Sequence, residues 1–185
     1  MDFLQRKENQ LEKEDKSDEG KWDDHIKQLC EKINTHEEYY TTSSCAGRVT
    51  LTKNHVNKSE NSFLFKSHEK ISFDELKNAL VKATTIFDSV LFKQESCILS
   101  VACDNLENAE KLMEKAQSCG WKRSGIISFT TRVVVELMST EKFEFPIVQN
   151  SKILVDDHFL RIIVEESNKK LEKTWEKIEK FVKFF

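Results

Sequence analysis

Residues 39–48 read Tyr-Tyr-Thr-Thr-Ser-Ser-Cys-Ala-Gly-Arg, a run of small hydroxyl side chains closed by a thiol, a glycine and an arginine. Serine and threonine side chains compete with regular backbone hydrogen bonding, so the stretch is expected to form a loop. Gly47 permits backbone conformations that other residues resist, and Arg48 offers a planar fork of donors for phosphate or carboxylate. Residues 49–52 alternate like a strand, so this loop should lead into a sheet.

A purely structural interpretation of the same stretch is the alternative. A Ser/Thr-rich segment before a strand is commonly only a turn, and a single cysteine such as Cys45 is commonly a small buried side chain. Arg48 has the further alternative of pairing with an internal carboxylate, such as that of Asp23 or Glu95. The residues alone leave both interpretations open.

Length and composition fit a single domain over residues 1–185. With 29 basic against 32 acidic residues the net charge is −3, so RNA binding would need a local basic patch. No run of about 18 apolar residues is present, and the charged start lacks the apolar core of a signal peptide. We therefore expect a cytoplasmic protein with no membrane span.

Cysteine usage supports the same compartment. The number of cysteines is odd, their spacing is irregular and no Cys-x-x-Cys pair occurs, which predicts neither a disulfide framework nor a metal site. A reducing cytosol fits this pattern. The five are Cys30, Cys45, Cys97, Cys103 and Cys119.

Hydrophobic spacing predicts helices and strands along the whole chain. Helices are expected at residues 2–14 and 23–35, from Ser72, from Asp104 to Gly120, and from Asp156 to the C-terminus. Strands are expected at residues 49–52, 63–68, 90–92, 97–103, 124–129, 132–137 and 143–147, with a polar hairpin loop at residues 53–62. Ser72 and Glu75 have the spacing of a capping box. The last helix is expected to bury Leu160, Val164, Leu171, Trp175 and Ile178.

The order of these elements predicts an α/β (α+β) fold. Two similar strand–helix–strand blocks favour a mixed β-sheet flanked by helices, with the long C-terminal helix packed on it. No Gly-x-Gly-x-x-Gly occurs at a strand–helix junction, so a Rossmann-type cofactor fold is not expected.

Beyond these patterns, the sequence resembles the tRNA wybutosine-synthesizing protein 3 family over nearly its whole length. The Thr-Thr-Ser-Ser-Cys-Ala-Gly-Arg run after a Tyr-Tyr pair resembles that family's signature. Further matches are a Ser-x-x-Gly-x-x-Asp element, a His at a strand end, a Glu between two strands, a Ser-Gly-Ile strand start and an Asn in the last helix. These fall on Ser17, Gly20, Asp23, His68, Glu95, Ser124, Gly125 and Asn168.

The resemblance implies a reaction and its partners. It implies methyl transfer from S-adenosyl-L-methionine to N4 of the demethylwyosine base, in its 7-aminocarboxypropyl form. That base lies next to the anticodon of phenylalanine tRNA, and the step belongs to wybutosine biosynthesis. Tyr39 and Tyr40 are available to stack on an unpaired loop base, unless they are core residues.

The resemblance also implies candidate site residues. Asp23, His68 and Glu95 are the candidate proton acceptors or orienting groups. Cys45 is expected to line the pocket rather than attack, and Arg48 to hold the cofactor carboxylate or an RNA phosphate. The full set for cofactor or RNA binding is Ser17, Gly20, Ser43, Ser44, Cys45, Gly47, Arg48, Ser124, Gly125 and Asn168.

Three departures from the family's pattern favour an alternative function. Glu19 stands where the family usually has Lys, Ser100 where it often has His, and Met138 where it commonly has Arg. They motivate a catalytically inactive RNA- or protein-binding module on the same fold. A third hypothesis, an enzyme with Cys45 as nucleophile, lacks a sequence-supported His/Asn pair.

Overall fold

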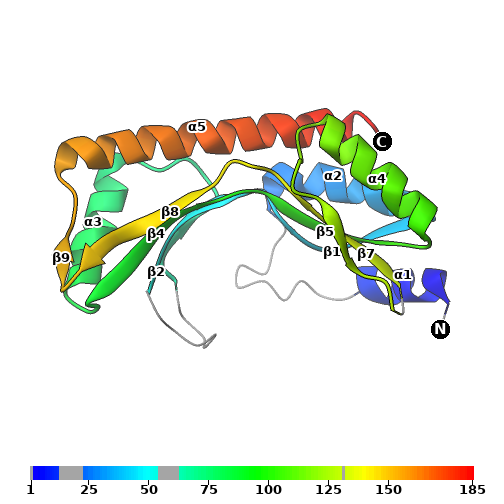
Figure 1. Cartoon of the computed structure of the whole chain (residues 1–185), viewed down its shortest axis with the longest axis horizontal. Coiled ribbons are helices and arrows are strands. Elements are labelled where there is room, and N and C mark those ends of the chain that lie inside the picture. The colour runs from blue at the N-terminus through cyan, green and yellow to red at the C-terminus, as the bar shows by residue number, and fades with distance from the viewer. Residues whose placement is uncertain (1, 13–22, 54–62, 131) are drawn as a thin grey trace. The chain divides into compact units, whose positions relative to one another are not determined.

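Two antiparallel β-sheets organise the chain in a computed structural model that describes residues 2–12, 23–53, 63–130 and 132–185. Each sheet belongs to one of two compact units (Figure 1). Unit 1 comprises Met1–Ala46, Cys97–Thr140 and Thr174–Phe185, and unit 2 comprises Gly47–Ser96 and Glu141–Lys173. The chain therefore passes repeatedly from one unit to the other, and a single domain over residues 1–185 stays a prediction.

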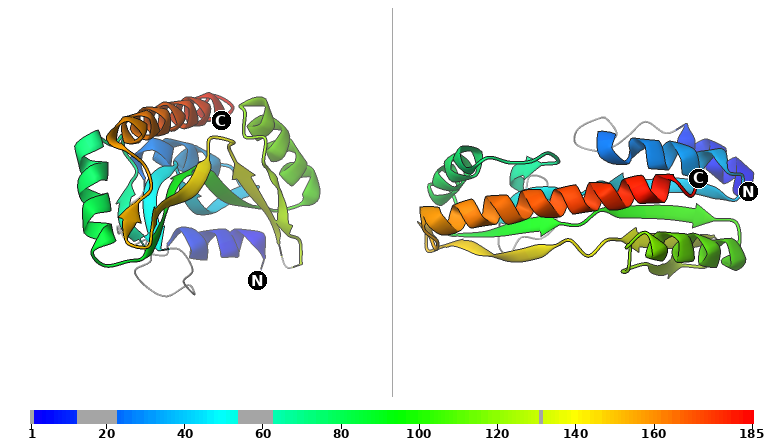
Figure 2. Two further views of the ribbon diagram at one scale, coloured as in Figure 1. Left: turned by 60° about the vertical axis from the view of Figure 1, so that its left-hand side comes forward. Right: turned by 90° about the horizontal axis from the view of Figure 1, so that it is seen from above.

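Sheet A, in unit 1, has the strand order β1-β5-β7-β6. The strands are β1 Tyr39–Cys45, β5 Ile98–Cys103, β7 Val133–Met138 and β6 Gly125–Ser128. Helices α2 (Asp24–Thr35) and α4 (Leu106–Ser118) cover one face, which we term the core face. Helix α1 (Phe3–Leu11) lies on the opposite, outer face, as Figures 1 and 2 show.

The core of unit 1 is made by alternate residues of the strands and by the apolar stripes of α2 and α4. Leu99, Val101 and Val135 are fully buried between the helices, together with Trp121. From α2 the buried residues are Ile26, Leu29, Cys30 and Ile33, and from α4 they are Ala109, Leu112 and Ala116. The buried residues therefore recur every second position in the strands and every three to four positions in the helices, as expected for these elements.

Local signals set the ends of these helices. The Asp23 side chain caps α2, and the Asn105 side chain caps α4 by accepting from the Asn108 N–H at 2.9 Å. Gly120 follows α4 with a φ of +94°, a left-handed conformation that suits glycine after a helix. Both helix starts and the α4 end lie within a residue or two of the sequence prediction.

Sheet B, in unit 2, has the strand order β3-β2-β4-β8-β9. The strands are β2 Arg48–Lys53, β3 Phe63–Ser67, β4 Ser89–Glu95, β8 Phe143–Gln149 and β9 Lys152–Ile153. Asn150 and Ser151, both with positive φ, connect β8 to β9 in a two-residue hairpin. Helix α3 (Phe73–Thr84) begins with the predicted capping box of Ser72 and Glu75, in which both reciprocal hydrogen bonds are present.

An aromatic cluster fills one face of sheet B. The fully buried Phe92 ring stacks on Phe143 and Phe145, with centroid distances of 5.7 and 5.4 Å. Phe159 of the last helix meets Phe145 edge-on at 6.3 Å. Such aromatic pairs hold the first part of that helix against the sheet of unit 2.

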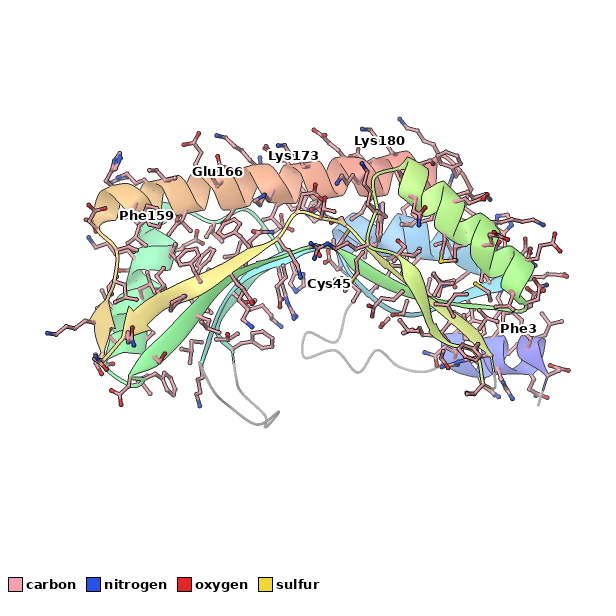
Figure 3. All side chains as sticks on the ribbon, in the orientation of Figure 1. Phe3, Cys45, Phe159, Glu166, Lys173 and Lys180 are labelled. Atoms are coloured by element: carbon pink, nitrogen blue, oxygen red, sulfur yellow. The ribbon has the colours of Figure 1, made fainter. Side chains whose placement is uncertain are left out.

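Helix α5 (Asp157–Val182) has 26 residues and contributes its first part to unit 2 and its last part to unit 1. Its buried stripe is Leu160, Ile163, Ser167, Leu171, Thr174, Ile178 and Phe181. Of the expected stripe, Val164 and Trp175 are only partly buried. Glu166, Lys173 and Lys180 lie on the exposed side (Figure 3). No described helix, α5 included, is long and apolar enough to cross a bilayer.

The predicted α+β, non-Rossmann class with a long C-terminal helix is confirmed, but three details are wrong. All described strand pairs are antiparallel, where one mixed sheet was expected. Leu4 and Leu11 are seven residues apart, which predicted a narrow apolar seam on the first helix, and helical spacing predicted that Leu106 is buried. All three are exposed. Residues 39–45 form a strand rather than a loop.

Strand β1 forms because side chains satisfy the backbone groups where its pairing with β5 is irregular. The Thr41 N–H donates to Asn34 Oδ1 at 2.8 Å, and Thr42 Oγ1 donates to the Ser100 carbonyl at 3.2 Å. Tyrosine and threonine also favour strands. The predicted turn is thereby reduced to the residues after Cys45, where Gly47 has a φ of +94°.

Candidate functional site

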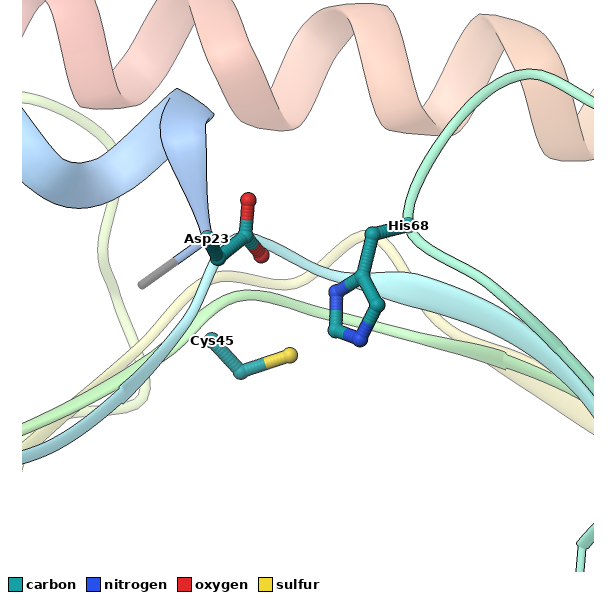
Figure 4. Close-up of side chains that lie close together, drawn as sticks. All are labelled: Asp23, Cys45 and His68. Atoms are coloured by element: carbon teal, nitrogen blue, oxygen red, sulfur yellow. The ribbon is translucent and has the colours of Figure 1, made fainter. Parts of the chain in front are cut away.

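Asp23 joins the start of α2 to the end of β1 within unit 1. Its Oδ1 accepts from the His25 N–H at 3.3 Å, and its Oδ2 accepts from the Ala46 N–H at 2.8 Å. Figure 4 shows Asp23 at the start of α2 and Cys45 at the end of β1. The carboxylate thus combines helix capping with fixing the end of the strand that carries the candidate serines.

The serines of β1 point to opposite faces of sheet A. An irregularity between Thr41 and Ser43 shifts the register, so that Ser43 pairs with Ser100 and Ser44 with Leu99. Ser44 faces the core side, near the Cys30 thiol of α2, whereas Ser43 is exposed. Of the two predicted binding serines, Ser43 is therefore the one that can meet a ligand.

Three rows of side chains cross the outer face of sheet A, because antiparallel partners project from the same face. The middle row consists of Ser43, Ser100, Glu136 and Gly125. One flanking row consists of Tyr40, Ala102 and Val134, and the other of Cys45, Ile98 and Met138. The strand register thus brings Ser43, Cys45 and Gly125, all predicted from the sequence, onto one surface.

Helix α1 closes one of these rows. The Phe3 ring lies 5.1 Å from that of Tyr40, which is fully buried, and Tyr40 Oη accepts from Arg132 Nη1 at 2.9 Å. Tyr39, on the core face, donates to the Asn108 carbonyl at 3.0 Å, and burial raises its pKa to about 12. Of the two alternatives for these tyrosines, the core role is the one present, because both rings are buried.

Gly125 and Ser124 differ in their surroundings. A Cβ built on Gly125 would meet nothing within 4 Å, so space is open beside this residue in the middle row. Ser124 Oγ donates to the Trp121 carbonyl at 2.6 Å, which fixes the turn before β6. Gly125 therefore borders open space on the outer face, and Ser124 has a structural partner.

In unit 2, Arg48 and Glu95 are directly opposite each other on β2 and β4. Arg48 Nε donates to Glu95 Oε2, and its guanidinium carbon lies 4.8 Å from the centre of the Phe63 ring. The alternative raised from the sequence, in which Arg48 pairs with Glu95, is the arrangement present. Arg48 and Glu95 thus already neutralise each other in the folded chain.

His68 and Asn168 also belong to unit 2. His68 follows β3 and is partly buried (Figure 4). Asn168 Oδ1 accepts from the Ile71 N–H and its Nδ2 donates to the Ile71 carbonyl, both at 2.9 Å. The amide of Asn168 therefore fixes the segment that connects His68 to the start of α3. Ser17 and Gly20 lie outside the described residues.

Comparison with known proteins decides the family. The model of the family described as Methyltransferase TYW3 matches residues 4–185. The chain belongs to this family. A Methanocaldococcus jannaschii relative named tRNA(Phe) 7-((3-amino-3-carboxypropyl)-4-demethylwyosine(37)-N(4))-methyltransferase is 38% identical over 164 residues, covering 85% of this chain and 83% of the relative. The tRNA wybutosine-synthesizing protein 3 homolog of Xenopus laevis is 34% identical over 185 residues, covering 97% and 72%.

Solved structures share the fold of this TYW3 methyltransferase. The PH1069 protein from Pyrococcus horikoshii superimposes with a TM-score of 0.80 at 33% identity, covering 89% of this chain and 84% of that one. The fold and the enzyme class therefore agree with the resemblance carried by the Thr-Thr-Ser-Ser-Cys-Ala-Gly-Arg run.

The thiols of the TYW3 chain give little support to a cysteine nucleophile. None of the five cysteines forms a disulfide, and four are buried. Burial raises the pKa of Cys30 and of Cys103 to about 12, and it also raises the pKa of Cys119. Because the thiolate is the nucleophile, such thiols are inert near neutral pH. Only Cys45 among the five is partly exposed.

One residue of this surface, Glu136, was missed from the sequence. It is the only charged residue of the strand Val133–Met138, and it stands in the middle row of the outer face. A single carboxylate inside an apolar strand was the available signal. Its neighbours in the row come from distant parts of the chain, so the sequence pattern alone did not place it beside Ser43.

Proposed function

We propose that this methyltransferase transfers a methyl group from S-adenosyl-L-methionine to N4 of 7-aminocarboxypropyl-demethylwyosine in phenylalanine tRNA. The observation that carries the proposal is the M. jannaschii relative named for that reaction, at 38% identity over 85% of this chain. The reaction is a step of wybutosine biosynthesis. We place it in the cytoplasm, where five cysteines that form no disulfide are expected to stay reduced.

The outer face of unit 1 offers a surface that fits the cofactor. Its middle row has hydroxyl and carboxylate groups beside an apolar row, and space is open at Gly125. S-adenosyl-L-methionine is likewise part apolar and part hydrogen-bonding, and when bound it supplies an electrophilic methyl group. Ser43, Glu136 and Gly125 are the residues we assign to holding it. Their role is to fix the donor so that the attacking nitrogen lies in line with it.

The RNA needs a local group of cations. The chain carries a net charge of −3, so its overall charge does not attract RNA. On the face of sheet B opposite the aromatic cluster, Lys66 and Lys93 flank Thr50 across the strands β3, β2 and β4. Lys93 is only loosely paired, since its Nζ lies 3.6 Å from an oxygen of the exposed Glu144. We assign the two lysines to contacts with tRNA phosphates, which position the RNA without reading its sequence.

Of the three candidate proton acceptors, we assign the role to His68. Glu95 is bound by the Arg48 guanidinium, and Asp23 accepts two backbone N–H groups, so both carboxylates serve the scaffold. His68 also has a partner in the folded chain, and we choose it for the chemistry of its imidazole. A neutral imidazole accepts a proton near physiological pH. His68 Nδ1 or Nε2 would take the proton that the methylated nitrogen releases, and would return it to solvent.

The test is a methylation assay with S-adenosyl-L-methionine and tRNA that lacks only this methyl group. Turnover by the wild type and its loss in His68→Gln by about 100-fold or more are expected. The control is His158→Gln, on the exposed start of α5, which should leave turnover unchanged. No methylation, with no binding of radiolabelled cofactor, would instead favour the inactive RNA- or protein-binding module.

A further inference from the structure

Glu136 is a carboxylate that the fold leaves without a partner. In the part of the chain that the structure describes, no hydrogen bond or ion pair engages it, although it is partly buried in the middle of β7. Its cross-strand neighbours are Ser100 on one side and Gly125 on the other. A partly buried carboxylate needs hydrogen-bond donors, and here solvent or a bound ligand supplies them.

The surroundings of Glu136 differ between the two sides of its row. The row of Tyr40 is closed, since that ring is fully buried and packs against Phe3. Next to Glu136, a Cβ placed on Gly125 would have no atom within 4 Å, and Ser43 is exposed at the far end of the row. The row is therefore open at its Gly125 end and exposed at its Ser43 end, and it adjoins the partly buried apolar side chains of Ile98 and Met138.

The chemistry of this row selects the ligand. A carboxylate with two hydroxyl side chains is rich in acceptors and negative, so it disfavours phosphate and favours hydroxyl or cationic groups. A ribose with both hydroxyls free donates two hydrogen bonds to one carboxylate, whereas a ribose inside an RNA strand has lost one of them to a phosphodiester. The adjoining apolar row suits the face of an adenine ring.

We infer that Glu136 accepts hydrogen bonds from the ribose diol of S-adenosyl-L-methionine, with Ser43 and the open side of Gly125 completing the adenosine site. The inference rests on the proposed function, because it names the place of that reaction's cofactor. The prediction from the family signature assigned cofactor binding to Arg48, whereas this inference assigns it to Glu136 of β7.

The experiment is calorimetric binding of S-adenosylhomocysteine and of its 2′-deoxy analogue to the full chain. Glu136→Gln should weaken S-adenosylhomocysteine binding by about 10-fold or more, because a hydrogen bond to a charged acceptor is replaced by a neutral one. The same substitution should change binding of the 2′-deoxy analogue by less than about 3-fold, since one of the two donors is already missing. Glu110→Gln, exposed on α4 at the other face of sheet A, is the matched control. Circular dichroism verifies that each variant is folded.

The outcomes separate this inference from the proposed function. Wild-type protein that fails to bind S-adenosylhomocysteine contradicts both. Wild-type binding that Glu136→Gln leaves intact overturns the inference alone. Equal losses for S-adenosylhomocysteine and the 2′-deoxy analogue overturn the diol contact. A loss confined to binding of an anticodon stem–loop RNA overturns the inference and assigns the row to an RNA nucleoside.

Discussion

The Asp23 carboxylate accepts a hydrogen bond from the Ala46 N–H at 2.8 Å and so ties the beginning of α2 to the residue after β1. The same side chain caps α2 through the His25 N–H. A residue that resembles a family motif and was considered as a proton acceptor is thus part of the scaffold that holds the serine-bearing strand.

Replacing Asp23 should therefore affect stability more than chemistry. Asp23→Ala is expected to lower the free energy of unfolding by about 1–2 kcal/mol, because a cap and a second acceptor are lost. Asp23→Asn keeps an acceptor and should cost less, with kcat within about tenfold of the wild type. Asp24→Ala, in the first turn but exposed, is the control. A folded Asp23→Asn protein without turnover would return the proton-acceptor role to Asp23.

Helix ends could be predicted from the sequence because their signals are local. Ser72 and Glu75 form the capping box three residues apart, and Gly120 ends α4 where its spacing indicated. The arrangement of strands in the sheets could not be predicted in this way. Strand β1 pairs with β5, which lies more than 50 residues later, and the successive strands β7 and β8 belong to different sheets. Strand pairing depends on which faces are buried together, and this information is spread along the chain.

The candidate site divides in the same way. The family signature pointed to Ser43 and Cys45, the Ser-Gly-Ile match pointed to Gly125, and the register places all three on one face. Arg48, from the same signature, pairs with Glu95 in sheet B. Glu136 was missed because its role depends on register across three strands, which no window of the sequence contains.

Thiol reactivity gives a second prediction. At pH 8 the folded protein should react quickly with a disulfide reagent at Cys45 only, because the other four thiols are buried. All five should react in denaturant. Cys45→Ser should abolish the fast phase, with Cys119→Ser as control. Rapid reaction of two or more thiols in the folded protein would show that the core of unit 1 opens readily.

The buried thiols also predict how stability depends on pH. Burial raises the pKa of Cys30 and Cys103 to about 12, so between their ordinary pKa of about 8.5 and this value the unfolded chain loses protons that the folded chain keeps. Stability should therefore be complete below about pH 8.5 and decline as the pH rises toward 12. Denaturant titrations of wild type and Cys30→Ala at pH 8 and pH 10.5 measure this. An equal decline in both proteins would contradict the contribution of Cys30.

Trp175 stacks on His25 at a centroid distance of 3.8 Å and an angle of 7°. Trp175→Ala should cost about 3 kcal/mol, since a partly buried indole loses both its packing and this ring contact. His25→Ala removes the other ring of this contact and leaves the indole in place, so it should cost less, about 1 kcal/mol. Chemical denaturation measures both. A cost under 1 kcal/mol for Trp175→Ala would mean that the end of α5 does not depend on this contact.

Substitution of Asn168 distinguishes a structural role of this residue from a role in ligand binding. Its amide makes two hydrogen bonds to the Ile71 backbone, so Asn168→Ala should cost about 2–3 kcal/mol through an unpaired N–H and carbonyl. Asn78→Ala, exposed on α3, should cost less than about 0.5 kcal/mol. Binding of S-adenosylhomocysteine, measured well below the melting temperature, should not change. Lost binding in folded Asn168→Ala protein would support the site role predicted from the family motif.

Arg48 provides the last prediction, because its pairing with Glu95 changes what its substitution should do. A lysine keeps the positive charge but loses the planar donor fork and the contact with the Phe63 ring. The two side chains are 28% and 36% exposed, so solvent screens the pair and we expect a loss of about 1–2 kcal/mol for Arg48→Lys. Activity should fall together with the melting temperature, since the pair holds β2 against β4 next to the segment that leads into sheet A.

A double-mutant cycle with Glu95→Gln tests whether the effect of Arg48→Lys comes from losing its pairing with Glu95. If the pair is structural, Arg48→Lys and Glu95→Gln should each lower stability, and the double variant should lose less than their sum by about 1 kcal/mol. Turnover should follow the same pattern when both are measured on one preparation. Full stability in Arg48→Lys with turnover abolished would instead show that the guanidinium acts on the cofactor carboxylate or on RNA phosphate. Unchanged stability and unchanged turnover would remove Arg48 from both roles.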